Sequence, residues 1–305
     1  MRIAHLSDLH VLDLDGVGAR RFLNKRFTGW VNLRVKREHK HRPGHVRAVA
    51  QEVSASKPDH VVITGDLTNL ALQTEFAAVS RLLEETLELD PHQISVVPGN
   101  HDLYTRGAMR SRRFSTYLAP YVQSDLPHLA ANLPLGRFPF VKLQDHVAII
   151  GLTSAVPRPP LMASGVLGRA QLAALIEILA HDDVKSRVPV VLLHHPPHNP
   201  PSKVKTVVEG LWDAEGLRDA LRGVPSGLVL HGHLHRRLQT DLTSSVGRML
   251  SVGATSASLH HEDEHRMAGF NVYDVGEDGE LSAEAHVYDP DDGSFSVRAI
   301  PTRGW

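Results

Sequence analysis

The sequence has no cysteine among its 305 residues. Disulfide bonds, thiolate catalysis, iron–sulfur clusters and zinc sites with sulfur ligands are therefore excluded. It also has no apolar run approaching the ~20 residues that a helix needs to cross a bilayer. The acidic side chain of Asp8 interrupts the first apolar stretch, which argues against a secretory signal peptide. We therefore expect a cytoplasmic protein.

Histidine is abundant in a composition that is otherwise ordinary for a globular protein. The chain has 21 histidines, and 42% of its residues are hydrophobic and 22% charged. Imidazole is a common metal ligand and the usual proton carrier near pH 7. Clusters of histidine are therefore the first place to look for function.

The net charge of −1 hides one strongly basic segment. Nine Lys and Arg residues lie between Arg20 and Arg42 with only Glu38 opposing them, whereas the rest of the chain has 24 basic and 33 acidic residues. The segment belongs to an insertion, residues 12–42. Its apolar side chains follow the spacing of a helix: Leu23, Phe27, Trp30 and Val31.

A basic amphipathic helix of this kind has three interpretations. It can pack its aromatic face on the body of the protein and leave its charges in water. It can contact a membrane surface or a lipid through residues 20–42, at the inner face of the membrane. Contact with nucleic acid is the least favoured interpretation, and it predicts binding that falls steeply with salt.

Short apolar strands alternate with helical patterns along most of the chain, which predicts an α/β fold. The expected strands are 2–7, 60–64, 94–97, 141–143, 146–152, 188–193 and 227–230. The expected helices are 44–56, 74–87, 109–122, 169–180 and 213–221. The β-rich portion 238–300 suggests a second sheet. Since no linker or repeat interrupts this pattern, we favour a single domain over residues 1–305.

Polar side chains follow five of the expected strands. The five elements are Asp8-Leu9-His10, Gly65-Asp66, Gly99-Asn100-His101-Asp102, His194-His195-Pro196 and Gly232-His233-Leu234-His235. Ligands bind at the carboxyl ends of strands in open α/β sheets, so these elements are expected to form one cluster. In an extended segment residues i and i+2 point the same way, so each Asp-x-His or His-x-His pair would aim at one centre. The glycines permit tight turns and close backbone approach.

The clustered residue types are those of a metal centre. Carboxylate, amide and imidazole groups together suit ions such as Mn, Fe, Zn or Co. Seven candidate ligands exceed the need of one ion with open positions, and they suit two ions ~3.5–4 Å apart, as in hydrolases that act at phosphorus. The seven are Asp8, His10, Asp66, Asn100, His194, His233 and His235. Asp66 is the natural candidate to bridge both ions.

The ordered set of motifs resembles the calcineurin-like metallophosphoesterases. The resemblance implies a four-layer α/β/β/α sandwich, in which two mixed β-sheets are flanked by helices. It implies one metal held by Asp8, His10, Asp66 and His235, and another held by Asp66, Asn100, His194 and His233. The family pattern His-x-Pro selects His194 rather than His195. His101 would stabilise the transition state or protonate the leaving group, and Asp102 would orient His101.

The resemblance also implies an activity. The compact layout is closest to the cyclic-nucleotide phosphodiesterases of the family, so the first expectation is hydrolysis of a nucleotide-like phosphodiester by a metal-bridging hydroxide. Two divalent ions, with Mn favoured, would be the cofactors. The alternatives are a membrane-associated hydrolase of a nucleotide–lipid pyrophosphate, a nuclease, and a catalytically silent scaffold. A scaffold is disfavoured because it has no need of the ligands or of His101.

Overall fold

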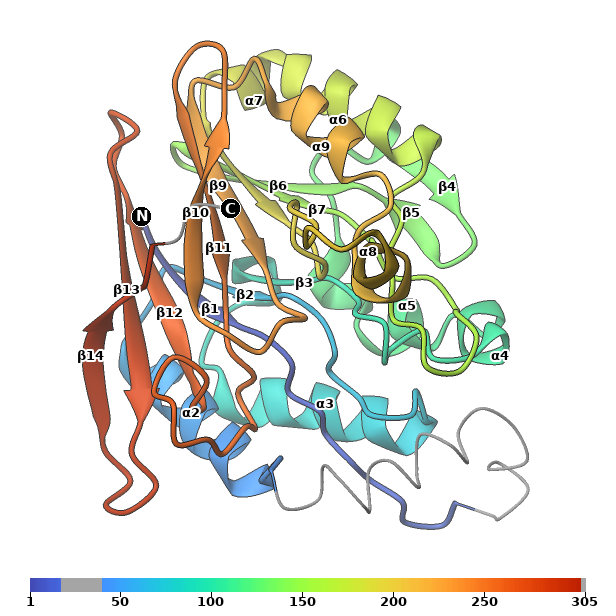
Figure 1. Ribbon diagram of the computed structural model, residues 1–305, viewed down its shortest axis with the longest axis vertical. Helices are drawn as coiled ribbons and strands as arrows, with labels where there is room; N and C mark the ends of the chain where they lie inside the picture. Colours follow the sequence, from blue (N-terminus) through green and yellow to red (C-terminus); the bar gives the residue numbers. More distant parts are fainter. Residues whose placement is uncertain (18–39, 303–305) are drawn as a thin grey trace.

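Two β-sheets lie between two sets of helices (Figure 1). The computed structural model describes residues 1–17 and 40–302, and within them it has two six-stranded sheets and one two-stranded sheet. Helices α2 (Pro43–Ala55) and α3 (Gln73–Thr86) cover one large sheet. Helices α6 (Arg169–Ala180), α7 (Asp182–Lys185) and α9 (Ala214–Leu221) cover the other. The predicted α/β/β/α sandwich is confirmed.

The first sheet joins the two ends of the chain. Its order is β14 (Phe295–Ala299), β13 (Leu281–Tyr288), β12 (Gly269–Val275), β1 (Arg2–Leu6), β2 (His60–Ile63) and β3 (Ile94–Val96). Strands β1, β2 and β3 are parallel, whereas β12, β13 and β14 pair antiparallel. The carboxyl ends of the three parallel strands therefore meet at one edge.

The second sheet is also mixed. Its order is β10 (Leu238–Thr243), β11 (Arg248–Gly253), β9 (Ser226–His231), β8 (Val188–Leu192), β7 (Val147–Gly151) and β6 (Phe140–Gln144). Strands β7, β8, β9 and β11 are parallel, and the two edge strands are antiparallel to their neighbours. The loops after β8 and β9 thus leave this sheet at the same edge.

The main core fills the space between the sheets. In β8, Val190 and Leu192 pack in the same cluster as Leu6 of β1, whereas Val191 packs with residues of α6 and α9. All of β8 is buried, because one of its faces meets the other sheet and the opposite face meets helices. This explains why its sequence is a continuous apolar run rather than an alternating one.

Most predicted elements occur within one residue of their expected bounds, but the helix expected at 109–122 is wrong. That segment forms two short helices, α4 (Arg106–Arg110) and α5 (Arg113–Tyr117), followed by a 3-10 turn at Ala119–Val122. Arg112 between the two helices has a left-handed backbone, with φ 47°, and Pro120 has no N–H for a helical hydrogen bond. Both features prevent one continuous helix over this segment.

Four further helices and strands lie where none was expected. They are α7 (Asp182–Lys185), α8 (Lys203–Glu209), β4 (Ala131–Leu133) and β5 (Gly136–Phe138). The predicted helical pattern from Leu23 to Val31, and most of the proposed membrane segment 20–42, lie outside the described residues. Within the described ranges, no helix is long and apolar enough to cross a bilayer.

Candidate metal centre

The first group of candidate ligands joins the loops after β1 and β9. Nε2 of His235 lies 3.0 Å from Oδ1 of Asp8 and 3.2 Å from Nε2 of His10. The other carboxylate oxygen of Asp8 accepts hydrogen bonds from the Ser7 hydroxyl and from the backbone N–H of His233. These bonds fix the carboxylate so that Oδ1 faces the imidazoles.

The second group joins the loops after β2, β3 and β8. Nε2 of His194 lies 3.1 Å from Oδ1 of Asn100 and 3.4 Å from Oδ2 of Asp66. Nδ1 of His194 lies 2.7 Å from the carbonyl oxygen of Thr64, to which it donates. A histidine that binds a metal through one nitrogen usually holds the other in such a bond.

Asp66 lies between the two groups. One of its oxygens falls within 4.8 Å of ligand atoms of Asp8 and His194, and the same holds for ligand atoms of His10 and His101. Its Oδ1 also accepts a hydrogen bond of 2.7 Å from the backbone N–H of His101. The carboxylate expected to bridge two ions therefore does lie where both groups reach it.

His233 and His195 pack against each other, and both rings lie beside His194. Nε2 of His233 lies 2.8 Å from the carbonyl oxygen of Glu209, and its ring centre lies 5.1 Å from that of His194. His195 uses both nitrogens elsewhere, at 2.8 Å from Oγ of Ser154 and 2.7 Å from the carbonyl of Ala163. Thus His194, not His195, faces the carboxylate and amide oxygens.

The spacing of these atoms fits divalent metal ions. Two ligand atoms that are each ~2.1 Å from one ion, at ~90–110° to one another, lie ~3.0–3.4 Å apart. Oδ1 of Asp8 is buried and makes no well-formed hydrogen bond to the described part of the chain. A buried oxygen of this kind is suited to bind a cation. The matching pairs are Asp8–His235 at 3.0 Å, Asn100–His194 at 3.1 Å, His10–His235 at 3.2 Å and Asp66–His194 at 3.4 Å.

The local backbone differs from the expected one. The paired ligands were expected to converge because their segments were extended, and this reason is wrong. Five candidate ligands have left-handed backbones: Asp8 (φ 53°), His10 (φ 49°), Asp66 (φ 50°), His233 (φ 69°) and His235 (φ 47°). Each such residue costs about 1–3 kcal/mol, so this strain is concentrated at the candidate site.

Two glycines allow the loops to approach closely. A Cβ on Gly99 would lie 2.2 Å from the backbone nitrogen of Asp66, and one on Gly65 would lie 2.5 Å from the nitrogen of Gly99. Gly65 also has φ +89°, which side chains rarely adopt. The expectation of close backbone approach is therefore confirmed at both positions.

His101 is held by a backbone carbonyl rather than by Asp102. Nδ1 of His101 lies 2.7 Å from the carbonyl oxygen of Asn69. The Asp102 carboxylate instead accepts bonds from the N–H groups of Gly99, Leu67 and Thr68 and from the Thr68 hydroxyl. The expected direct orientation of His101 by Asp102 is wrong, because backbone donors of two loops surround this buried carboxylate.

Burial and neighbouring charges set the protonation of the centre. Burial lowers the pKa of His10 well below its usual value and that of His233 to about 3, and neighbouring imidazoles add to both shifts. Burial also opposes the charge of His194, but Asp66 and Asp8 outweigh it and raise the pKa of His194 to about 9. Binding a metal at His194 must therefore displace a proton, so metal affinity falls as pH falls.

One histidine beside the centre was not predicted. The ring centre of His41 lies 4.7 Å from that of His10 and 5.5 Å from that of His235. His41 follows no strand, so the search for polar residues at strand ends could not find it. His231, in contrast, is a buried histidine at the end of β9, with Nδ1 3.2 Å from the carbonyl oxygen of Gly232.

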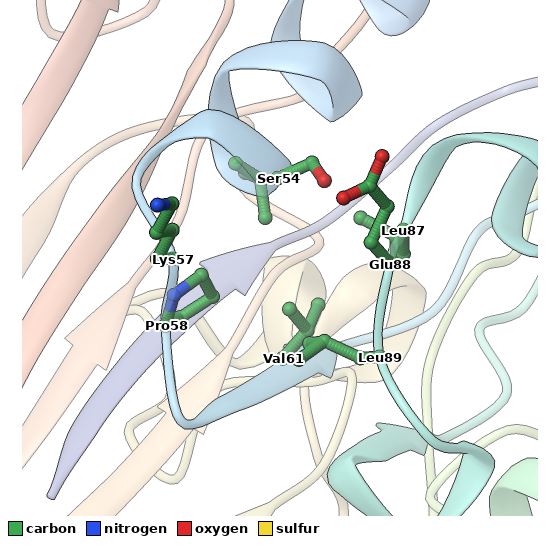
Figure 2. Close-up of a pocket in the computed structure, with 8 residues that line it drawn as sticks. Ser54, Lys57, Pro58, Val61, Leu87, Glu88 and Leu89 are labelled. Atoms are coloured by element: carbon green, nitrogen blue, oxygen red, sulfur yellow. The ribbon is translucent and has the colours of Figure 1, made fainter.

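A small pocket lies away from these residues (Figure 2). It is lined by Val53, Ser54, Lys57, Pro58, Val61, Leu87, Glu88 and Leu89. Lys57 and Pro58 precede β2, whereas Asp66 follows it. The pocket therefore lies toward the amino end of the strand, opposite the candidate ligands, and plays no part in the site.

Comparison with known proteins agrees with this geometry. The family model described as calcineurin-like phosphoesterase matches residues 1–237. The chain belongs to this family. It is a phosphoesterase, as its motifs predicted.

Two relatives are similar to this chain in sequence over most of its length. A cAMP/cGMP dual specificity phosphodiesterase of Mycobacterium tuberculosis (strain CDC 1551 / Oshkosh) is 31% identical over 252 residues, which cover 82% of this chain and 69% of the relative. A probable cyclic nucleotide phosphodiesterase of Rhodococcus erythropolis (strain PR4 / NBRC 100887) is 26% identical over 240 residues, covering 77% and 68%.

Two solved structures share the fold of this chain. A dimetal phosphatase from Danio rerio has a TM-score of 0.60 at 15% identity, covering 98% of this chain and 99% of the other. A purple acid phosphatase from yellow lupin seeds has a TM-score of 0.58 at 12% identity, covering 99% and 54%. At these identities the likeness supports the fold alone.

Proposed function

We propose that this phosphoesterase hydrolyses a nucleotide-like phosphodiester with the help of two divalent metal ions. The observation that carries the proposal is the place of Asp66 between two groups of ligand atoms. Asp8, His10 and His235 would hold one ion, and Asn100, His194 and His233 the other, with Asp66 shared. When bound, two such ions polarise a phosphoryl oxygen and lower the pKa of water enough to supply a nucleophile near neutral pH.

His101 would act on the substrate rather than on a metal. Its bond to the Asn69 carbonyl places a hydrogen on Nδ1 and fixes the ring. A second proton, on Nε2, would let the ring donate to the leaving oxygen or to a phosphoryl oxygen on which negative charge develops. Asp102 would act indirectly, since its bonds keep the loop that bears His101 against the loop that bears Asp66.

The substrate class is supported by the relatives. Both are named as cyclic nucleotide phosphodiesterases, one of them with cAMP and cGMP as substrates. We therefore propose a small phosphodiester as the substrate.

The test is one assay on metal-stripped protein. Bis(p-nitrophenyl) phosphate and p-nitrophenyl phosphate would be offered with and without Mn²⁺, followed by cAMP and cGMP. Turnover of the diester that needs metal and exceeds that of the monoester supports the proposal. Preference for the monoester makes the enzyme a phosphatase. Two bound metals with no turnover would instead favour a pyrophosphate or lipid substrate.

Three further points of the proposal rest on the sequence. We propose Mn²⁺ as the favoured ion, a single domain over 1–305, and a cytoplasmic enzyme. For segment 20–42, packing on the protein is the first interpretation and contact with a membrane surface the second. Binding to anionic vesicles that weakens as salt is raised would support contact with a membrane. Binding that salt does not change, or no binding, would favour packing of the segment on the protein.

A further inference from the structure

His41 lies beside the first group of candidate ligands although it comes from the end of the insertion. Its backbone bridges to Leu259 in antiparallel fashion. On either side, Arg42 donates to the carbonyl of Ser258, and His260 donates to the carbonyl of Lys40. These contacts fasten the end of the insertion to the segment that follows β11.

The side chain of His41 is held in a way that suits a ligand. Its Nδ1 lies 2.7 Å from Oγ of Ser258. That hydroxyl lies 3.0 Å from Oγ of Ser256, which donates to the carbonyl of Asp8 at 2.6 Å. A hydrogen bond at one ring nitrogen fixes the orientation of a histidine whose other nitrogen binds a metal.

The ring faces the other imidazoles of the first group. One nitrogen from each of His10, His41 and His235 lies within 4.8 Å of the other two. His10 is buried and the other two are partly buried. We propose that His41 is a further ligand of the ion held between His10 and His235. This inference rests on the proposed function, because it presumes that the first group holds a metal.

The added ligand has a chemical consequence. With His41, three imidazoles face the first ion beside the carboxylates of Asp8 and Asp66. Imidazole suits Zn, Fe, Ni and Cu, whereas oxygen ligands suit Mn. His41 therefore raises the affinity of the first position for Zn²⁺ relative to Mn²⁺, and the insertion tunes which metal the enzyme takes.

The test compares metal binding by two variants and the wild type. His41→Asn keeps a polar atom near the position of Nδ1 and removes Nε2. His260→Asn is the matched control, because His260 belongs to the same backbone contact but its ring lies against His45, at 5.6 Å. Zn²⁺ and Mn²⁺ dissociation constants and stoichiometry would be measured by competition with a chelator. Melting of the metal-free proteins would show that both variants fold.

We expect an effect in only one of the two variants, and there on only one of the two ions. His41→Asn should raise the dissociation constant of one of the two Zn²⁺ ions about tenfold or more, and should change the dissociation constants of Mn²⁺ less. His260→Asn should bind both ions as the wild type does. Unchanged Zn²⁺ affinity in a folded His41→Asn protein would overturn the inference, even if its turnover falls.

A second measurement needs no variant. In crystals of Zn²⁺-loaded wild type, anomalous scattering should place an ion ~2.1 Å from a ring nitrogen of His41. A zinc ion on His10 and His235 with His41 beyond bonding distance would overturn the inference and leave the proposed function intact. A wild type that binds no metal at all would overturn both.

Discussion

Nε2 of His10 and Nε2 of His235 lie 3.2 Å apart although 225 residues separate them in the chain. His10 follows β1 of the first sheet, and His235 follows β9 of the second. An ion between them would therefore tie the two layers of the sandwich together at their shared edge. Metal binding and folding stability should be linked for this reason.

Removing metal should lower the stability of the wild type. An ion that binds only the folded state adds ~2.7 kcal/mol when its free concentration is 100 times its dissociation constant. We expect Mn²⁺ or Zn²⁺ to raise the melting temperature of the stripped protein, whereas Ca²⁺, which prefers six to eight oxygen ligands, should have a smaller effect. Equal melting temperatures with and without every ion would contradict a metal link between the sheets.

Substituting Asp66 should affect both ions at once. Asp66→Ala removes the oxygens that lie between the two groups. We expect the variant to lose both ions on dialysis and to lose turnover, whereas Asn100→Ala should weaken only the second ion. Metal content by mass spectrometry separates these cases. Two ions retained per chain in Asp66→Ala would refute the shared position.

Substituting His101 should separate chemistry from metal binding. A positioned proton donor contributes about 10²–10⁴-fold to rate, so His101→Ala should lower kcat by that order. Its metal content and melting temperature should stay near those of the wild type, because Nδ1 bonds a carbonyl outside the two ligand groups. A parallel loss of metal and activity would instead make His101 a ligand.

The sequence predicted most strands and helices, and it placed the candidate ligands after strands, because both depend on short-range patterns. The four-layer arrangement was expected only from the family resemblance. A strand buried on both faces, such as β8, is a run of apolar residues, and the carboxyl ends of parallel strands must meet. His194 could be chosen over His195 only through the family motif. The structure supplies a physical basis for that choice, since Ser154 and the Ala163 carbonyl occupy both nitrogens of His195.

What the sequence could not predict depends on contacts between distant residues. The left-handed backbones of Asp8 and His10 arise where the loop after β1 bonds to the loop after β2. The role of Asp102 depends on which backbone N–H groups turn toward it. His41 reaches the centre only because the segment after β11 pairs with the end of the insertion.

The surroundings of Asp102 predict a loss of stability rather than of chemistry. Asp102→Asn turns one acceptor into an NH₂ group that faces N–H donors. Each buried donor left without an acceptor costs about 1–3 kcal/mol, so the free energy of unfolding should fall by about that much. Asp145→Asn, at an exposed turn residue, is the control. A fall in kcat at unchanged stability would contradict this prediction and would indicate that Asp102 acts directly on His101.

A buried carboxyl away from the centre predicts a pH effect. Glu75 of α3 accepts hydrogen bonds from the N–H groups of Leu70 and Leu72. Burial raises its pKa from 4.5 to about 8 in the folded protein. The folded state thus keeps a proton that the unfolded chain releases. The resulting stabilisation is complete below the ordinary pKa and is lost as pH rises toward 8.

Glu75→Gln should remove this dependence, because a neutral amide still accepts both N–H bonds and carries no charge to bury. The free energy of unfolding of the variant minus that of the wild type should rise between pH 5 and 8, by at most ~1.4 kcal/mol per pH unit. Urea unfolding at several pH values measures the difference. Glu84→Gln, on the exposed face of the same helix, should show no such rise. A flat difference for Glu75→Gln would mean that Glu75 is ionised at neutral pH despite its burial, with its two backbone donors outweighing the cost of desolvation.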